Sequence, residues 1–171
     1  MEKKQTNIWG IFVAVIAGLI VWQVLMGGYG SASKMVGKAA PAFEPGTWVT
    51  SSPPSSSHLA GNGYVLEFWA TWCGPCEQTI PHLIELTREY PDVVFIGLST
   101  DDSAEPVRQM VREKGINYHV AMAGLMASRY GVRGIPAAFV IDSEQTIVWQ
   151  GHPIDPGLEK AIKELARQPQ N

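Results

Sequence analysis

The chain has 171 residues, of which 46% are hydrophobic and 17% are charged, and its formal net charge is −3 at pH 7. These values describe a folded protein with room for one ordinary domain and a short appendage, and they exclude a disordered or fibrous protein. The negative charge argues against nucleic acid as a partner, and two cysteines are too few for a four-cysteine zinc site or a disulfide-stapled mini-protein.

The N-terminal part of the chain has the composition of a membrane anchor. Residues 1–7 are polar, and the next 19 residues, 8–26, carry no charge. As an α-helix this stretch would span about 28 Å, close to the hydrocarbon thickness of a bilayer. We expect an uncleaved transmembrane signal anchor, because the core of a cleaved signal peptide usually has only about 7–15 apolar residues.

The flanks of this span predict its orientation and a tether. Lysines occur on both sides of it, so the Lys/Arg count does not decide the topology. The short basic start resembles the beginning of a signal peptide. It indicates a single-pass protein of the cytoplasmic (inner) membrane, with residues 1–7 in the cytoplasm and the domain facing the periplasm or cell exterior. Residues 27–38, rich in Gly, Ser and Ala, predict a flexible linker to a domain at 39–171.

The domain alternates short apolar, β-prone runs with amphipathic segments. The pattern predicts strands and helices in turn: strands at 64–69, 93–99, 119–122, 137–141 and 147–150, and helices at 73–90, 104–114, 125–130 and 156–167. Ser103 and Gly115 are expected to cap the second helix. The Pro/Ser-rich stretch 51–57 predicts a surface loop, and Asp101 and Asp102 a polar one. This alternation predicts an α/β fold with a mixed central sheet flanked by helices.

Cys73 and Cys76, the two cysteines of the chain, lie where the first predicted strand turns into a helix. At a helix N-terminus, unpaired N–H groups and the helix dipole stabilise a thiolate. We therefore expect the pKa of the Cys73 thiol to lie below its usual value of about 8.5 and Cys73 to be the attacking nucleophile. The spacing places Cys76 close enough to be the resolving thiol, so the pair would form a redox-active disulfide.

Two other interpretations of the cysteine pair are weaker. A structural disulfide more usually closes a longer loop, where it removes more entropy from the unfolded chain. A metal site would need two more ligands, and none of the four histidines has a standard zinc spacing to the pair: His58, His82, His119 and His152. The pattern favours redox catalysis, with no metal.

The residues around the pair resemble a known family. The run 66–76 (LEFWATWCGPC) resembles the active-site strand and turn of the thioredoxin superfamily. Pro41-Ala42-Phe43, the strand–helix material between Val93 and Met122, and Gly134-Ile135-Pro136 resemble its membrane-anchored TlpA/ResA-like branch. The resemblance implies a thioredoxin-like fold with one N-terminal transmembrane helix and the activity of a membrane-tethered thiol–disulfide oxidoreductase.

The resemblance also implies roles for individual residues. Glu67 matches a buried acid that exchanges protons with the second cysteine, and burial would raise its pKa towards neutrality. The alternative is a glutamate at a sheet edge, paired with a lysine. Pro136 matches a cis-proline that faces the disulfide, and the backbone of Ile135 would bind an extended substrate segment. The residues beside and between the two cysteines would also contact substrate: Trp72, Gly74 and Pro75. For Trp72, the alternative is a plain packing role.

The sequence departs from the family at two places that leave the substrate open. Thr79 stands where some cytochrome-maturation members have a glutamate, and Ala137-Ala138 stands where Thr-Thr is frequent. The peroxiredoxin pattern of Pro, Thr and Cys is absent around Cys73, which argues against a peroxidase.

The expected function is reduction of disulfides in exported proteins, such as apocytochrome c or copper-site proteins. The expected partners are protein disulfides and a transmembrane thiol electron donor; the protein is expected to be a monomer without a bound cofactor. Two rivals remain open. A disulfide-forming oxidase or isomerase shares every motif, and a copper-delivery module would use the two thiols with His119 or His152.

Overall fold

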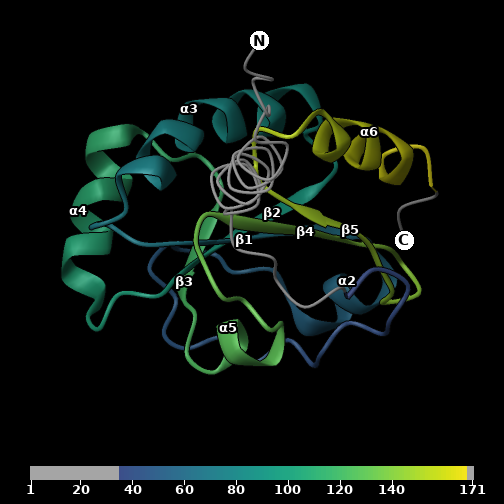
Figure 1. Ribbon diagram of the computed structural model, residues 1–171, viewed down its shortest axis with the longest axis horizontal. Helices are drawn as coiled ribbons and strands as arrows, with labels where there is room; N and C mark the ends of the chain where they lie inside the picture. The colour runs from purple at the N-terminus through teal and green to yellow at the C-terminus, as the bar shows by residue number, and fades with distance from the viewer. Residues whose placement is uncertain (1–34, 169–171) are drawn as a thin grey trace, which may run out of the picture. The chain divides into compact units, whose positions relative to one another are not determined.

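The computed structural model describes residues 35–168, which form one sheet with helices on both faces (Figure 1). The five strands have the spatial order β3-β2-β1-β4-β5. Their bounds are β1 (Tyr64–Trp69), β2 (Val94–Ser99), β3 (His119–Met122), β4 (Ala137–Ile141) and β5 (Ile147–Gly151). β1 pairs in parallel with β2 and antiparallel with β4, so the sheet is mixed, as the sequence predicts.

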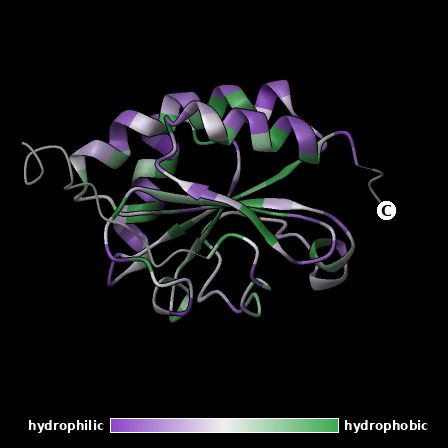
Figure 2. Cartoon of the chain, turned by 45° about the vertical axis from the view of Figure 1, so that its right-hand side comes forward, coloured by the Kyte–Doolittle hydropathy of each residue, from purple (hydrophilic) through white to green (hydrophobic). Residues whose placement is uncertain are grey.

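The helices divide between the two faces of the sheet. Three long helices cover one face and two short ones the other (Figure 1): α3 (Gly74–Glu89), α4 (Ala104–Lys114) and α6 (Pro156–Leu165), against α2 (Ser56–Gly61) and α5 (Met126–Arg129). In Figure 2 the strands are mostly hydrophobic, whereas the long helices alternate hydrophilic and hydrophobic bands. A separate apolar core therefore fills the space on each side of the sheet.

β1 is the central strand, and all six of its residues are buried. Five of them are apolar or aromatic, and the sixth is Glu67. A carboxyl group in such a place loses its water on both faces of the sheet, so it must be hydrogen-bonded or neutral. The fold thus isolates one titratable group directly before the turn that carries the cysteines.

The predicted elements agree closely with the structure, with two exceptions at helix ends. The Ser103 side chain makes no capping hydrogen bond to α4, whereas Gly115 ends that helix in the left-handed region with φ 63°. The Pro/Ser-rich stretch was predicted to be a loop, but α2 begins within it. Ser55 caps α2 by accepting a hydrogen bond from the His58 N–H at 3.1 Å.

The C-terminal end of the predicted flexible linker belongs to the folded domain. The Gly37 N–H donates to the Ile147 carbonyl at 2.8 Å, and the Ile147 N–H donates to the Lys38 carbonyl at 2.9 Å. Ala39 forms an antiparallel bridge with Thr146. The prediction of a flexible tether was therefore wrong for residues 35–38, because the outer edge of β5 supplies their hydrogen-bond partners.

The predicted membrane anchor, residues 8–26, lies outside the described residues, as do residues 1–7 and most of the predicted linker. Within residues 35–168, no helix has both the length and the apolar character needed to span a bilayer.

Candidate redox site

Cys73 lies at the junction of β1 and α3 and is the N-cap residue of that helix. It is disulfide-bonded to Cys76, with an S–S distance of 2.01 Å. The Cys73 Sγ accepts a hydrogen bond from the Cys76 N–H at 3.2 Å, as capping side chains do. Pro75 stands in the first helical turn, where its missing N–H costs no hydrogen bond. Once reduced, Cys73 would present its sulfur to a free N–H at the positive end of the helix dipole.

The two sulfurs differ in exposure. Cys76 is completely buried, and Cys73 is 6% exposed, so an incoming sulfur reaches the pair from the Cys73 side. Trp72, next to it, is 70% exposed, and Gly74 and Pro75 are also exposed. The three residues predicted to contact substrate therefore form an open surface around the accessible cysteine.

The loop before β4 faces the accessible cysteine. The Ile135 carbonyl oxygen lies 3.8 Å from the Cys73 Sγ. The Ile135–Pro136 peptide bond is cis, as the resemblance implies. The fold thus brings these two residues, more than sixty positions along the chain, to the redox pair.

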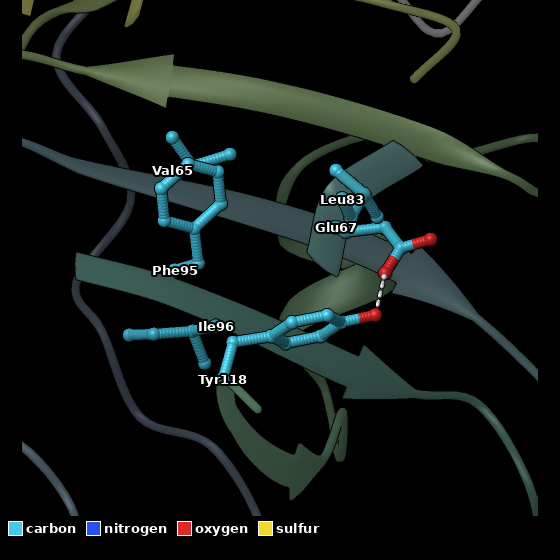
Figure 3. Close-up of a pocket in the computed structure, with 6 residues that line it drawn as sticks. All are labelled: Val65, Glu67, Leu83, Phe95, Ile96 and Tyr118. Carbon is cyan, nitrogen blue, oxygen red and sulfur yellow. Dashed lines mark hydrogen bonds between the residues drawn. The ribbon is translucent and has the colours of Figure 1, made fainter. Parts of the chain in front are cut away.

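Glu67 lies behind the pair in β1 and is 2% exposed. The Tyr118 hydroxyl donates to Oε2 at 3.3 Å (Figure 3). The Thr79 hydroxyl lies 3.4 Å from Oε1. Burial raises the pKa of Glu67 to about 8, although hydrogen bonds from Tyr118 and Thr79 act in the opposite direction. The alternative of a sheet-edge glutamate is wrong, because β1 is the central strand.

Thr79 links the second cysteine to this carboxyl group. The Thr79 hydroxyl has one proton and two acceptors in reach, the Cys76 carbonyl at 2.8 Å and Oε1 of Glu67 at 3.4 Å. It can donate to Oε1 when Glu67 is ionised; when Glu67 is protonated, the hydroxyl can donate to the carbonyl and accept from Oε1–H. One turn of α3 thus separates the buried sulfur from the hydroxyl that contacts the acid.

Asp101 holds the turn that leads into Cys73, a role that the sequence analysis missed. Its carboxylate accepts hydrogen bonds from the Thr71 N–H at 2.9 Å, the Thr71 hydroxyl at 2.6 Å and the Ser99 hydroxyl at 2.7 Å. The two oxygens of one carboxylate have enough lone pairs to accept from all three donors. Its place in the sequence could have indicated this role. Asp101 follows β2, and the adjacent parallel strand β1 ends at the same edge of the sheet.

The histidines are not gathered at the cysteines. His119 lies on the edge strand β3 and packs its ring on Trp48, in the core on the face opposite α3. Desolvation lowers the pKa of His119. Across residues 35–168, no three His, Cys, Asp or Glu side chains form a group that could hold a metal ion. The geometry offers no support for the copper-delivery interpretation.

Comparison with known proteins places this site in a family. A family model described as the AhpC/TSA family matches residues 36–150. The chain is 30% identical over 172 residues to the thiol-disulfide oxidoreductase ResA of Bacillus thuringiensis (strain Al Hakam), which covers 96% of this chain and 99% of that protein. It is 28% identical to the thioredoxin-like protein YneN of Bacillus subtilis, over 81% of this chain and 84% of that protein.

Solved structures show the same fold. A thiol:disulfide interchange protein of the thioredoxin family from Chlorobium tepidum TLS matches 80% of this chain and 99% of its own, with a TM-score of 0.64 and 27% identity. A thiol-disulfide isomerase from Corynebacterium glutamicum matches 76% and 98%, with a TM-score of 0.66 and 22% identity, which shows the fold alone. The chain belongs to the AhpC/TSA family and is a thioredoxin-like thiol-disulfide oxidoreductase that carries a Cys73–Cys76 pair.

Proposed function

We propose that this oxidoreductase reduces disulfides in exported proteins, with Cys73 as the nucleophile, Cys76 as the resolving thiol and Glu67 as the proton-transfer group. The observation that carries the proposal is the order of the three groups. The accessible sulfur lies at the helix N-cap, the second sulfur is buried, and a buried acid with a pKa near 8 lies behind it. Each group has the surroundings that its step requires.

In the first step, the Cys73 thiolate attacks one sulfur of the substrate disulfide. A bond forms between Cys73 Sγ and that sulfur, the substrate S–S bond breaks, and the other substrate sulfur leaves as a thiolate. The exposure of Cys73 and the burial of Cys76 give the attack its direction. The N-cap position stabilises the thiolate before it attacks.

In the second step, Cys76 releases the substrate. Its thiol gives a proton to Glu67, its sulfur bonds to Cys73, and the Cys73–substrate bond breaks, so that two electrons have passed to the substrate. When a donor reduces the pair again, Cys76 leaves as a thiolate and takes a proton back from Glu67. A pKa of about 8 keeps that proton on Glu67 in the oxidised protein at neutral pH.

The open surface around Cys73 would bind the substrate chain. Ile135 borders the pair through its backbone, and an extended segment could form main-chain hydrogen bonds beside it. Trp72 offers a large exposed apolar side chain at the edge of the same surface, with Gly74 and Pro75 next to it. Pro136 fixes the end of the loop at the start of β4.

The setting of the reaction is also part of the proposal. An anchor at residues 8–26 would hold the domain outside the cytoplasmic membrane, where a transmembrane thiol carrier would supply electrons. The proposed substrates are apocytochrome c or copper-site proteins, as the resemblance of residues 66–76 and 134–136 to the TlpA/ResA-like branch implies. The protein would act as a monomer and need no bound cofactor.

The reduction potential of the Cys73–Cys76 couple in the full-length chain tests the direction of the reaction. The scale runs from about −270 mV for thioredoxin to about −120 mV for a strong periplasmic oxidant. We expect a value near the thioredoxin end. A value near the oxidant end would overturn the reductase proposal and indicate a disulfide-forming oxidase or isomerase.

A further inference from the structure

Tyr118 and Thr79 contact different oxygens of Glu67. Tyr118 comes from the segment before β3 and donates to Oε2, whereas Thr79 comes from α3 and faces Oε1. Because α3 also carries Cys76, the two oxygens of Glu67 have different surroundings. Oε1 faces the helix of the reacting sulfur, and Oε2 is held by a residue that no step of the mechanism uses.

The sheet makes room for Tyr118 at this point. Gly97 is the register partner of Glu67 on β2. A Cβ atom at position 97 would lie 3.1 Å from the Tyr118 ring and 2.9 Å from the Trp69 indole nitrogen. Any larger residue would therefore push the phenol away from the carboxyl group. Tyr118 is itself only 7% exposed.

A small cavity of about 10 Å³ lies beside the pair, and Figure 3 shows the residues around it. Its lining is Glu67, Tyr118 and four other residues: Val65, Leu83, Phe95 and Ile96. The surface of this cavity is almost entirely apolar, so it cannot supply the two or more polar partners that a water molecule needs. The hydrogen bond from Tyr118 is therefore the contact that holds Oε2 of Glu67.

The elements packed around Glu67 present few titratable groups. In register, β2 presents Gly97 and β4 presents Ala138. α3 presents Thr79, with Cys76 one turn before it, and the segment before β3 presents Tyr118. Burial beside the carboxyl group raises the pKa of Tyr118 well above 10, so its hydroxyl remains a hydrogen-bond donor through the working pH range.

We propose that Tyr118 is a positioning residue for proton transfer: its hydroxyl holds Oε2 of Glu67 as an acceptor, so that Oε1 carries the exchangeable proton towards α3. The proposal rests on the proposed role of Glu67. A hydrogen bond to the ionised form of a carboxyl group favours that form, so Tyr118 also makes Glu67 a stronger acid than burial alone would allow.

Tyr118→Phe tests this with the loss of one oxygen atom. The titration midpoint of the Glu67 carboxyl in the full-length oxidised protein would be followed by infrared difference spectroscopy and assigned with Glu67→Gln. We expect the midpoint to rise by about one pH unit, the usual scale for losing one hydrogen bond to a charged group. The pH profile of disulfide exchange should move in the same direction, with about a tenfold lower rate on its rising part.

Tyr130→Phe is the matched control, because Tyr130 is also buried but lies in the core on the other face of the sheet. The titration midpoint of Glu67 in Tyr130→Phe should equal that in the unmodified protein. An unchanged or lower midpoint in Tyr118→Phe, or equal shifts in both variants, would overturn the proposal.

Glu67→Gln separates this inference from the proposed function. If disulfide exchange by Glu67→Gln keeps the pH profile of the unmodified protein, the proposed catalytic role of Glu67 is wrong. The titration midpoint of Glu67 in Tyr118→Phe would still report whether Tyr118 controls the carboxyl group.

Discussion

The place of Glu67 in the central strand carries a cost in stability beside its proposed role in proton transfer, because the charged form of the side chain is buried there. Its pKa is raised from 4.5 to about 8 in the folded protein, and burial is the largest cause. Between these two values the folded state binds more protons than the unfolded state. The free energy of unfolding must therefore fall as the pH rises through this window, with a slope of up to about 1.4 kcal/mol per pH unit.

Glu67→Gln should remove this pH dependence, because an amide fills the same place without a charge. The variant should gain stability relative to the unmodified protein between about pH 5 and pH 8 and keep that advantage above pH 8. Urea unfolding of the oxidised proteins at several pH values measures the difference. Glu85→Gln, on the exposed side of α3, is the control. Its free energy of unfolding should change with pH as that of the unmodified protein does. A constant gap between Glu67→Gln and the unmodified protein would contradict the shifted pKa.

At the scale of elements, the strands and long helices were predictable because their hydrophobic periods are local. The short helix α2 was not, since it depends on the single cap at Ser55 within a Pro/Ser-rich stretch. The site divides in the same way. The cysteines are visible as a spaced pair and Glu67 only through a family resemblance, whereas Asp101 and Tyr118 act through contacts that the sheet creates.

The turn between β1 and α3 depends on the carboxylate of Asp101. Asp101→Asn should leave at least one donor of Thr71 or Ser99 without its charged acceptor and destabilise the domain by about 1–3 kcal/mol. The same change should slow reaction of the reduced protein with a small disulfide, because the N-cap position of Cys73 depends on that turn. Asp102→Asn is the matched control, since its neighbouring side chain is exposed. Equal effects in the two variants would show that the turn does not need Asp101.

At the scale of the whole molecule, the folded domain begins earlier in the chain than its composition predicts. The composition assigns residues 35–38 to the Gly-, Ser- and Ala-rich linker, yet Gly37 and Lys38 form backbone hydrogen bonds with Ile147 at the outer edge of β5. An uncovered edge strand leaves backbone groups unpaired and invites pairing with other chains. This segment is therefore part of the folded domain, held to it by backbone hydrogen bonds.

A chain that begins at Met35 should consequently be as stable as one that begins at residue 27, whereas a chain that begins at Pro41 should be less stable. The second truncation removes three backbone hydrogen bonds: Gly37 N–H to Ile147 O, Ile147 N–H to Lys38 O, and Ala40 N–H to Gln145 O. At about 1 kcal/mol each, their loss should lower the free energy of unfolding by about 3 kcal/mol, measured by urea denaturation. Faster amide exchange at Ile147 in the shorter chain would locate the loss at β5. Equal stability of the three chains would mean that the segment is a tether after all, and that the domain begins where its composition suggests.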